Sequence, residues 1–369
     1  MVSNDGRVNP VDATTPRIGL LVGDGIGHEI VPAAQRTVDA AMSAVGAPEV
    51  QWVELPVGYD AIAEHGDPLP ASTLDALDGL DAWVLGPHDS AGYPAQFRGR
   101  LTPGGTIRKR FDLFANIRPA KAFAGVYATA PEMDLVIVRE NTEGFYADRN
   151  MFTGSGEFMP TPDVAMAVGV VTRRACERIA HTAFRLAQGR RRRVTVVHKA
   201  NVLSLTTGLF RDVCVEVGAQ YPDVEIRTEH VDAMAAHLVR RGADFDVVVT
   251  ENMFGDILSD LSGELAGSLG LAASLNSSET RAMAQAAHGA APDIAGRNRA
   301  NPTALMLSAA MLLDWMSERR TDAVLGLAAD RIRLGVTGTL AAGVATADLG
   351  GLASTAEFTE TVGARILRR

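Results

Sequence analysis

The sequence predicts an α/β protein built on a mainly parallel sheet, and three observations support this prediction. Short apolar runs of buried-strand length alternate with segments that repeat apolar residues at helical spacing, a pattern typical of parallel α/β folds. The chain has 369 residues, enough for about two domains at roughly 150 residues each. Its 47% hydrophobic and 21% charged residues are ordinary for a globular protein, so disorder is not expected.

The first part of the chain alternates in this way up to a long irregular segment. Strands are expected where short apolar runs occur, and helices where apolar residues recur every three or four positions. The expected strands are 18–22, 50–54 and 82–85, and the expected helices are 28–45 and 71–77. Residues 86–105 are rich in Gly, Pro and polar side chains and are expected to form a long loop, which in a compact domain usually has a functional role.

The rest of the chain continues the alternation and then becomes mostly helical. The expected strands are 135–138, 194–197, 224–228 and 245–250. The expected helices are 171–188, 204–217, 232–240, 255–266, 302–318, 323–334 and 355–367. Residues 268–301 are expected to be irregular apart from a short helical stretch at 279–287.

The composition excludes several function classes. A net charge of −9 gives no overall basic field for nucleic acid. No stretch approaches the roughly 18 uninterrupted apolar residues of a membrane span, and residues 1–17 lack the apolar core of a signal peptide. Cys176 and Cys214 have no metal-ligand or disulfide-framework spacing and are expected to be buried thiols in a reducing compartment. A cytoplasmic protein that contacts neither nucleic acid nor membrane is therefore expected.

Three arginines are candidates for binding an anionic substrate. Arg108 follows a Gly-rich loop, Arg118 precedes Pro119, and Arg139 ends an apolar strand. Parallel sheets place ligand-binding groups at strand ends, and a guanidinium binds a carboxylate through two hydrogen bonds at once. Each arginine taken alone is more often a surface or ion-pair residue, and the sequence does not reveal whether the three converge.

Asp256 and Asp260 are candidates for binding a divalent cation. They are four residues apart in an expected helix, which puts both carboxylates on one face with about 5–6 Å between Cβ atoms. Mg²⁺ or Mn²⁺ neutralises such a pair, because hard cations prefer oxygen ligands. The alternative for Asp256 is a favourable charge at the first turn of its helix. Asp232 is a third candidate ligand, and its alternative is a helix N-cap.

Lys199 and Tyr146 are candidates for proton transfer, because each follows a strand-like run. A lysine beside a cation or an arginine cluster has its charged form disfavoured and is suited to act as a base near neutral pH. A tyrosine is suited to deliver a proton to a developing carbanion. The alternatives are a surface lysine and an interfacial tyrosine.

Two glycine-rich stretches bear on a nucleotide cofactor. The first, residues 23–27, follows a strand but does not match GxGxxG, because its third glycine comes one residue early, so an ordinary Rossmann site is not expected. The second covers 288–296, with Asn301 beyond it. Asp293 lies within it, and a carboxylate there favours the ribose 2′-hydroxyl of NAD and repels a 2′-phosphate. The alternative is a turn-forming Pro-Asp pair.

Six blocks of the chain, taken together, resemble the isocitrate, isopropylmalate, homoisocitrate and tartrate dehydrogenase family. The blocks are residues 23–30, 107–119, 138–146, 198–203, 250–260 and 288–302. Each block alone is weak evidence, but six in the right order over nearly the whole chain are specific. The resemblance implies the two-domain α/β fold of this family, with a mainly parallel sheet and without the ordinary Rossmann strand order.

The resemblance also implies how the chain is divided. Residues 1–112 and 268–369 would form a cofactor-binding domain assembled from both ends of the chain. Residues 113–267 would form a second domain that binds substrate and metal and makes a homodimer. An arm at 151–162 would clasp the second subunit, and the active sites would be shared across the interface.

Positions that match the family's motifs acquire roles by resemblance. The implied substrate-binding residues are Arg108, Arg118, Arg139 and Asn201, and the implied metal ligands are Asp256, Asp260 and, from the partner subunit, Asp232. Lys199 resembles the family's general base, which would reach across the subunit interface as Asp232 would. Tyr146 resembles the family's proton donor. The implied cofactor-binding residues are Ile26, His288, Gly289, Ala291, Asp293 and Asn301. The implied activity is NAD-dependent oxidative decarboxylation of a 3-substituted malate of the isocitrate, homoisocitrate or 3-isopropylmalate type, with Mg²⁺ or Mn²⁺.

Departures from the family pattern leave the substrate open. Gln285 stands where many members carry a Glu, and the loop 101–107 lacks the residues by which isocitrate and isopropylmalate members select the third substituent of the substrate. Residues 139–146 resemble the isocitrate, homoisocitrate and tartrate branches. Tartrate or D-malate oxidation is therefore the alternative activity. A non-catalytic regulatory subunit is a remote alternative, because none of the eight Arg, Asp, Lys and Tyr candidates is lost.

Overall fold

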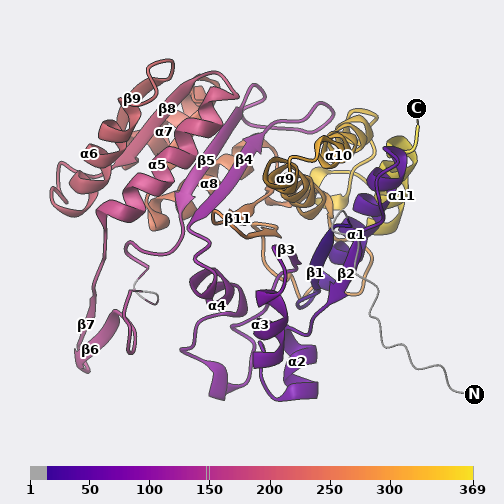
Figure 1. Cartoon of the computed structure of the whole chain (residues 1–369), viewed down its shortest axis with the longest axis horizontal. Coiled ribbons are helices and arrows are strands. Elements are labelled where there is room, and N and C mark those ends of the chain that lie inside the picture. Colours follow the sequence, from indigo (N-terminus) through magenta and orange to yellow (C-terminus); the bar gives the residue numbers. More distant parts are fainter. Residues whose placement is uncertain (1–14, 147, 149, 369) are drawn as a thin grey trace, which may run out of the picture.

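The computed structural model describes residues 15–146, 148 and 150–368. Within these residues the main feature is one ten-stranded sheet (Figure 1). Three strands from the N-terminal part of the chain and two from residues 275–285 form one half of it, and strands from residues 115–250 form the other half. The strands are β1 (Arg17–Leu21), β2 (Gln51–Glu54), β3 (Ala82–Leu85), β4 (Ala115–Lys121), β5 (Asp134–Glu140), β8 (Arg193–His198), β9 (Glu225–His230), β10 (Val247–Thr250), β11 (Leu275–Ser277) and β12 (Ala282–Gln285). Their order is β2-β1-β3-β12-β11-β4-β5-β10-β8-β9.

The sheet is parallel in both halves and antiparallel in its centre. Neighbours run parallel from β2 to β12 and from β5 to β9, whereas β12-β11, β11-β4 and β4-β5 are antiparallel. Every residue of β3 and β10 is buried, as expected for strands covered on both faces. The prediction of a mainly parallel sheet without Rossmann order is thus confirmed.

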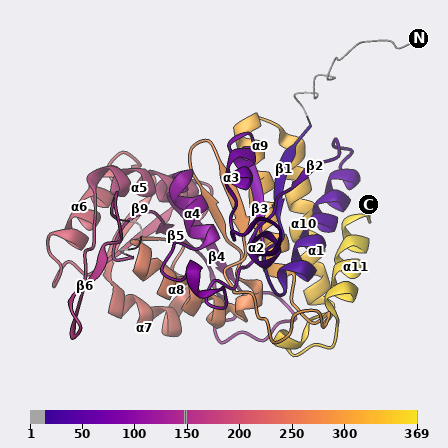
Figure 2. The same cartoon turned by 90° about the horizontal axis from the view of Figure 1, so that it is seen from below.

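Helices cover both faces of the sheet. They are α1 (Gly27–Ala44), α2 (Gly58–His65), α3 (Ala71–Asp78), α4 (Pro103–Arg110), α5 (Arg173–Gln188), α6 (Thr206–Gly218), α7 (Val231–Arg241), α8 (Asn252–Ala266), α9 (Thr303–Arg320), α10 (Ala323–Ala341) and α11 (Thr355–Ile366). On the first half of the sheet, α1, α9, α10 and α11 pack on one face, and α3 and α4 on the other. On the second half, α5 and α6 share a core on one face, and α7 and α8 on the other (Figure 2).

The central strands bring the two halves together on one side of the sheet. Arg108 on α4 contacts Gln285 at the end of β12, and Arg118 on β4 contacts Ser259 on α8. Helix α4 therefore contacts the antiparallel centre of the sheet at β12 and helix α8 contacts it at β4, and the candidate site lies between the two helices. A hairpin of β6 (Glu157–Thr161) and β7 (Val164–Ala167) projects away from the body of the molecule (Figure 1).

Most expected elements are found within a few residues of their predicted ends, and one prediction is wrong. Residues 279–287 were expected to contain a short helix, but Ala282–Gln285 form the fully buried strand β12 between β3 and β11. A four-residue apolar run has no readable period, so its place in the sheet decides its conformation. Further elements that were not expected are α2, α4, β4, the hairpin strands β6 and β7, and β11. Two consecutive glycines hide the helical pattern of α4. The helix begins with Thr102 as its N-cap and Pro103 in its first turn.

The structure bears on two predictions, the state of the cysteines and the lack of a membrane-spanning helix. Cys176 and Cys214 are buried and form no disulfide, as expected. In the described part of the chain, every helix is too short or too polar to cross a membrane.

Candidate active site

The glycine turn after β1 is held by a buried aspartate. The side chain of Asp24 is 2% exposed and accepts hydrogen bonds from the backbone N–H of Tyr59 at 2.7 Å, the N–H of Asp89 at 2.8 Å and the hydroxyl of Tyr93 at 2.6 Å. Gly25 has a φ of +56°, and a Cβ there would lie 2.1 Å from the Ala290 carbonyl oxygen. The Asp24 carboxylate therefore holds the turn to the segments that carry Tyr59, Asp89 and Tyr93.

Arg118 lies between the two carboxylates of α8. Its Nη1 is 3.4 Å from Asp256 Oδ1 and 3.3 Å from Asp260 Oδ1. The guanidinium is oriented by Ser259, whose hydroxyl accepts from Nη1 at 2.7 Å, and by Asn116, whose Oδ1 accepts from Nε at 2.6 Å. Asp256 and Asp260 thus lie on one helix face, as their spacing predicts, with a guanidinium against both.

Arg139 and Tyr146 converge on the same aspartate. Arg139 Nη1 donates to Asp256 Oδ1, and Tyr146 Oη donates to Asp256 Oδ2 at 2.6 Å. Arg139 also donates from Nε and Nη2 to Asn252 Oδ1, at 2.9 and 2.7 Å. Gly255 makes room for this arginine, because a Cβ there would lie 2.6 Å from Arg139 Cγ. Four predicted site residues, Arg118, Arg139, Tyr146 and Asp256, therefore form one contact network.

The charges in this network set the protonation of the two carboxyl groups. Burial tends to raise the pKa of Asp256, but the positive charges of Arg139 and Arg118 and the Tyr146 hydrogen bond outweigh it, so its pKa lies below the ordinary value. The pKa of Asp260 is raised, chiefly by burial and by the nearby negative charge of Asp256, against the attraction of Arg118. An additional cation beside the pair would favour ionisation of both carboxyl groups.

Arg108 and Arg118 line one cavity of about 190 Å³. Arg108 Nη2 donates to Gln285 Oε1 at 2.9 Å, so the glutamine that departs from the family pattern contacts a predicted substrate arginine. The other lining residues are Pro87, His88, Ser274, Asn276, Ala286, Ala287, His288 and Gly289. The three arginines are therefore linked, Arg108 to Arg118 through the cavity and Arg118 to Arg139 through Asp256.

Lys199 and Asp232 form a separate pair on the second half of the sheet. Lys199 Nζ lies 2.6 Å from Asp232 Oδ1, and Asp232 belongs to the first turn of α7. This hydrogen bond is the main reason why the pKa of Asp232 lies below its ordinary value. Asn201 is exposed two residues beyond Lys199. In the described part of a single chain, no group of three or more His, Cys, Asp or Glu side chains is arranged to hold a metal ion.

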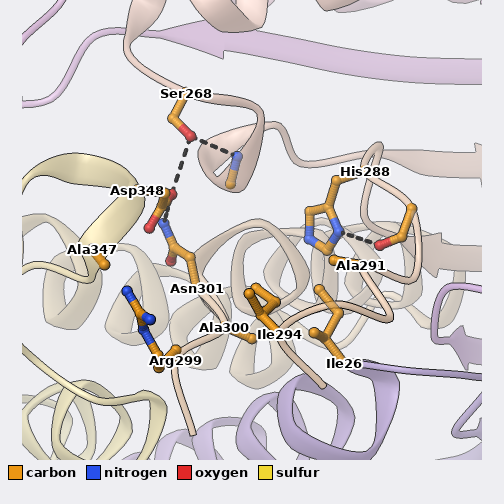
Figure 3. A pocket seen from close by; sticks show the side chains of 12 residues that line it. Ile26, Ser268, His288, Ala291, Ile294, Arg299, Ala300, Asn301, Ala347 and Asp348 are labelled. Atoms are coloured by element: carbon orange, nitrogen blue, oxygen red, sulfur yellow. Dashed lines mark hydrogen bonds between the residues drawn. The ribbon is translucent and has the colours of Figure 1, made fainter. Parts of the chain in front are cut away.

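A second and larger pocket, of about 470 Å³, contains most of the predicted cofactor residues. Its lining includes Ile26, His288, Gly289, Ala291 and Asn301. In Figure 3, Asn301 and Asp348 lie together on one side of the pocket, and His288 lies on the other side, with apolar side chains between them. Asp348 Oδ2 accepts from Asn301 Nδ2 at 2.9 Å and from Ser268 Oγ at 3.1 Å.

Two details of this pocket concern its ligand. His288 lines both this pocket and the arginine cavity, and its Nε2 is buried without a hydrogen-bond partner among the described residues. Asp293 is exposed and does not line the pocket, whereas Asp348, which sequence reasoning missed, does. Arg299 is the one lysine or arginine among the described lining residues.

A model of the isocitrate/isopropylmalate dehydrogenase family matches residues 17–362. The chain belongs to this family. It is 44% identical to the isocitrate/homoisocitrate dehydrogenase of Thermus thermophilus over 94% of this chain and 97% of that relative. It is 38% identical to the 3-isopropylmalate/3-methylmalate dehydrogenase of Methanocaldococcus jannaschii over 95% of this chain and 98% of that relative.

A solved structure supports the same assignment. The crystal structure of isocitrate dehydrogenase from Methylococcus capsulatus has a TM-score of 0.85 and 38% identity to this chain, and covers 96% of this chain and 100% of its own. Like other members of the isocitrate/isopropylmalate dehydrogenase family, the chain is an oxidoreductase that acts on a hydroxy acid with decarboxylation.

Several residues of this site had no individual signal in the sequence. Asn116 and Asn252 orient the arginines, and His88 and Asp348 line the two pockets. Asn116 lies in an Asn-Ile-Arg-Pro run and Asn252 immediately before the Asp256 helix turn, so proximity to a predicted residue was the available signal. His88 and Asp348 lie in segments of irregular sequence, where only the fold places them.

Proposed function

We propose that this enzyme oxidises and decarboxylates a 3-substituted malate with NAD and a divalent cation, Mg²⁺ or Mn²⁺. The observation that carries the proposal is the convergence of Arg118, Arg139 and Tyr146 on Asp256, beside a cavity that Arg108 lines. Guanidinium groups around a small cavity suit a substrate with two or three carboxylates. A carboxylate pair beside them suits a hard cation.

The residues present fit a divalent cation. Asp256 and Asp260 offer carboxylate oxygens from one helix face, and they currently face Arg118. One chain offers no third acidic ligand in this group among its described residues, which agrees with a ligand supplied by Asp232 of a second subunit. A substrate carboxylate that draws the arginines away from Asp256 would free its oxygens for the cation.

The residues present also fit NAD. The unpartnered Nε2 of His288 lies where the larger pocket meets the arginine cavity, a position suited to the nicotinamide-ribose half. At the far side, Asn301 and Asp348 offer the amide and carboxylate groups that an adenosine needs. The carboxylate of Asp348, which lines the pocket, disfavours a 2′-phosphate, and this supports NAD over NADP as the sequence argument from Asp293 does.

A homodimer completes the proposed site. Lys199 and Asp232 of one subunit would enter the cleft of the other, in a domain of residues 113–267 that is distinct from a cofactor domain of 1–112 and 268–369. The side chains of Phe158, Met159 and Met166 on the β6–β7 hairpin are about half exposed or more, and those of Val202 and Leu205 beyond Lys199 more so. A lone two-stranded hairpin has little stability, so these apolar groups support an arm that packs on a second subunit.

The chemistry assigned to this chain's residues follows from their positions. When bound, a divalent cation would supply a Lewis acid that polarises the substrate oxygen, and NAD would supply the hydride acceptor. Arg108, Arg118 and Arg139 hold the carboxylates and orient the hydroxyl-bearing carbon. Lys199 takes the hydroxyl proton, and Tyr146 returns a proton to the carbon that carbon dioxide leaves. The buried thiols of Cys176 and Cys214 support a reducing, cytoplasmic location.

Oxidation of tartrate or D-malate by the same residues is the second candidate, because the arginine cavity is small and polar. A spectrophotometric panel tests both. Purified enzyme with Mn²⁺ and NAD or NADP is offered isocitrate, homoisocitrate, 3-isopropylmalate, D-malate and tartrate in turn. We expect reduction of NAD with one of these acids, release of carbon dioxide and loss of activity in EDTA.

Each part of the proposal has a contradicting result. Activity unchanged in EDTA would exclude the carboxylate-metal site. A strong preference for NADP would exclude the argument from Asp293 and Asp348 and point to Arg299 as a phosphate ligand. A monomer in sedimentation analysis that retains full activity would exclude the shared active site.

A further inference from the structure

His88 occupies the part of the arginine cavity nearest α4. It follows Pro87 after β3 and lines the cavity with Arg108 and Gln285. The Gly104 N–H donates to His88 Nε2 at 3.4 Å. A Cβ on Gly104 would lie 3.2 Å from His88 Cε1 and 3.4 Å from Arg108 Nη2. The imidazole thus takes the space that a side chain at 104 would fill, directly beside a predicted substrate arginine.

The imidazole is neutral at physiological pH and presents a donor. Burial, followed by the positive charge of Arg108, lowers the pKa of His88 to about 4, with Asp24 opposing. Because Nε2 accepts from Gly104, we assign the single ring proton to Nδ1. The Nδ1–H is a hydrogen-bond donor without charge, unlike the arginines around it.

The walls of this cavity do not suit an alkyl group. Its described lining contains no Val, Leu, Ile, Met or aromatic side chain apart from the two imidazoles. The polar lining residues are His88, Arg108, Arg118, Ser274, Asn276, Gln285 and His288. A branched alkyl group placed here would gain little apolar contact and would leave buried polar groups without hydrogen-bond partners, which is unfavourable.

We propose that His88 is a specificity-determining residue that donates a hydrogen bond to an oxygen atom on the third substituent of the substrate. The substrate class is then a malate with a hydroxyl or carboxylate-bearing substituent, in preference to a branched alkyl one. This inference rests on the proposed function, because it assumes that the carboxylates of a malate occupy the arginines. Gly104 is required for this arrangement, since a larger residue there would displace the His88 imidazole.

Two substitutions test the hydrogen bond. His88→Leu fills similar space without a donor, and His88→Asn keeps an amide donor in place of Nδ1–H. Turnover is measured with NAD and Mn²⁺ on isocitrate, homoisocitrate, tartrate, 3-isopropylmalate and D-malate, which has no third substituent. Binding of the same acids is measured by calorimetry with Mn²⁺ and without NAD. The separate acids distinguish a carboxylate acceptor from a hydroxyl.

We expect the wild-type enzyme to prefer at least one oxygen-bearing substrate to 3-isopropylmalate by about 10-fold or more in kcat/KM. His88→Leu is expected to lower kcat/KM for the preferred oxygen-bearing substrate by about 10- to 100-fold, as expected for one buried hydrogen bond. The change is expected mainly in KM. The same variant is expected to change kcat/KM for D-malate by less than about 3-fold. His88→Asn is expected to retain most of the wild-type kcat/KM for that substrate, because its amide keeps a hydrogen-bond donor.

The contradicting results are distinct. An equal loss with D-malate would mean that His88 only supports Arg108, and a wild-type preference for 3-isopropylmalate would exclude the assigned substrate class. Failure of His88→Leu to weaken binding of any oxygen-bearing acid would overturn the inference while leaving the proposed function intact. Selective binding of these acids without reduction of NAD would overturn the proposed function and retain the role of His88.

Discussion

Replacement of Asp24 by Asn tests whether the glycine turn after β1 is a structural fastening. In the native protein Oδ1 accepts from the Tyr59 N–H, and Oδ2 accepts from the Asp89 N–H and the Tyr93 hydroxyl. Asparagine keeps the shape of the side chain but has one acceptor oxygen. Its NH₂ group would face either the Tyr59 N–H or the Asp89 N–H and the Tyr93 hydroxyl, so at least one buried donor loses its partner.

The magnitude follows from these contacts. A hydrogen bond to a charged group contributes about 1.5–3 kcal/mol, and a buried donor left unpaired costs about 1–3 kcal/mol. We therefore expect Asp24→Asn to lower the free energy of unfolding by about 3 kcal/mol. With roughly 2.1 cal/mol/K of unfolding entropy per residue over 369 residues, that loss lowers the melting temperature by about 4 °C.

Calorimetry and urea denaturation measure the effect, and Asp60→Asn is the matched control. Asp60 is an exposed aspartate on α2, 3.7 Å from His28 Nε2, so its replacement is expected to cost less than about 0.5 kcal/mol. An Asp24→Asn protein that melts within about 1 °C of the wild type would refute the structural role.

Two further predictions concern pH and catalysis. Burial, with Glu143 and Glu140 nearby, raises the pKa of Glu251 to about 8, so this group binds more protons in the native state than in the unfolded state. Its contribution to stability is fully present below about pH 4.5 and is lost as pH rises through about 8. Glu251→Gln is expected to reduce the fall in the free energy of unfolding between pH 5 and 8, measured by urea denaturation, by about 3 kcal/mol, and an unchanged pH dependence would contradict this. Lys199→Ala is expected to reduce kcat by about 10²- to 10⁴-fold without changing the melting temperature, and near-normal turnover would identify another base.

The sequence was most informative where the chain carries a local pattern. The apolar run before Arg139 predicted a buried strand, and the spacing of Asp256 and Asp260 predicted carboxylates on one helix face; both are found. Patterns without a period misled. The sequence predicts a helix over 279–287, but residues 282–285 form a strand because they pair with β3 and β11.

The sequence by itself determined the alternation of strands and helices, the family and the residues able to bind carboxylates or a cation. Those properties depend on residues close together in the chain, whose periodicity and order are readable. Only the tertiary structure decided that Arg118 and Arg139 share Asp256, that His288 stands between two pockets and that His88 lies beside Arg108. Such contacts join residues far apart in the sequence, because strand register and helix packing bring them together, and no local pattern encodes those distances.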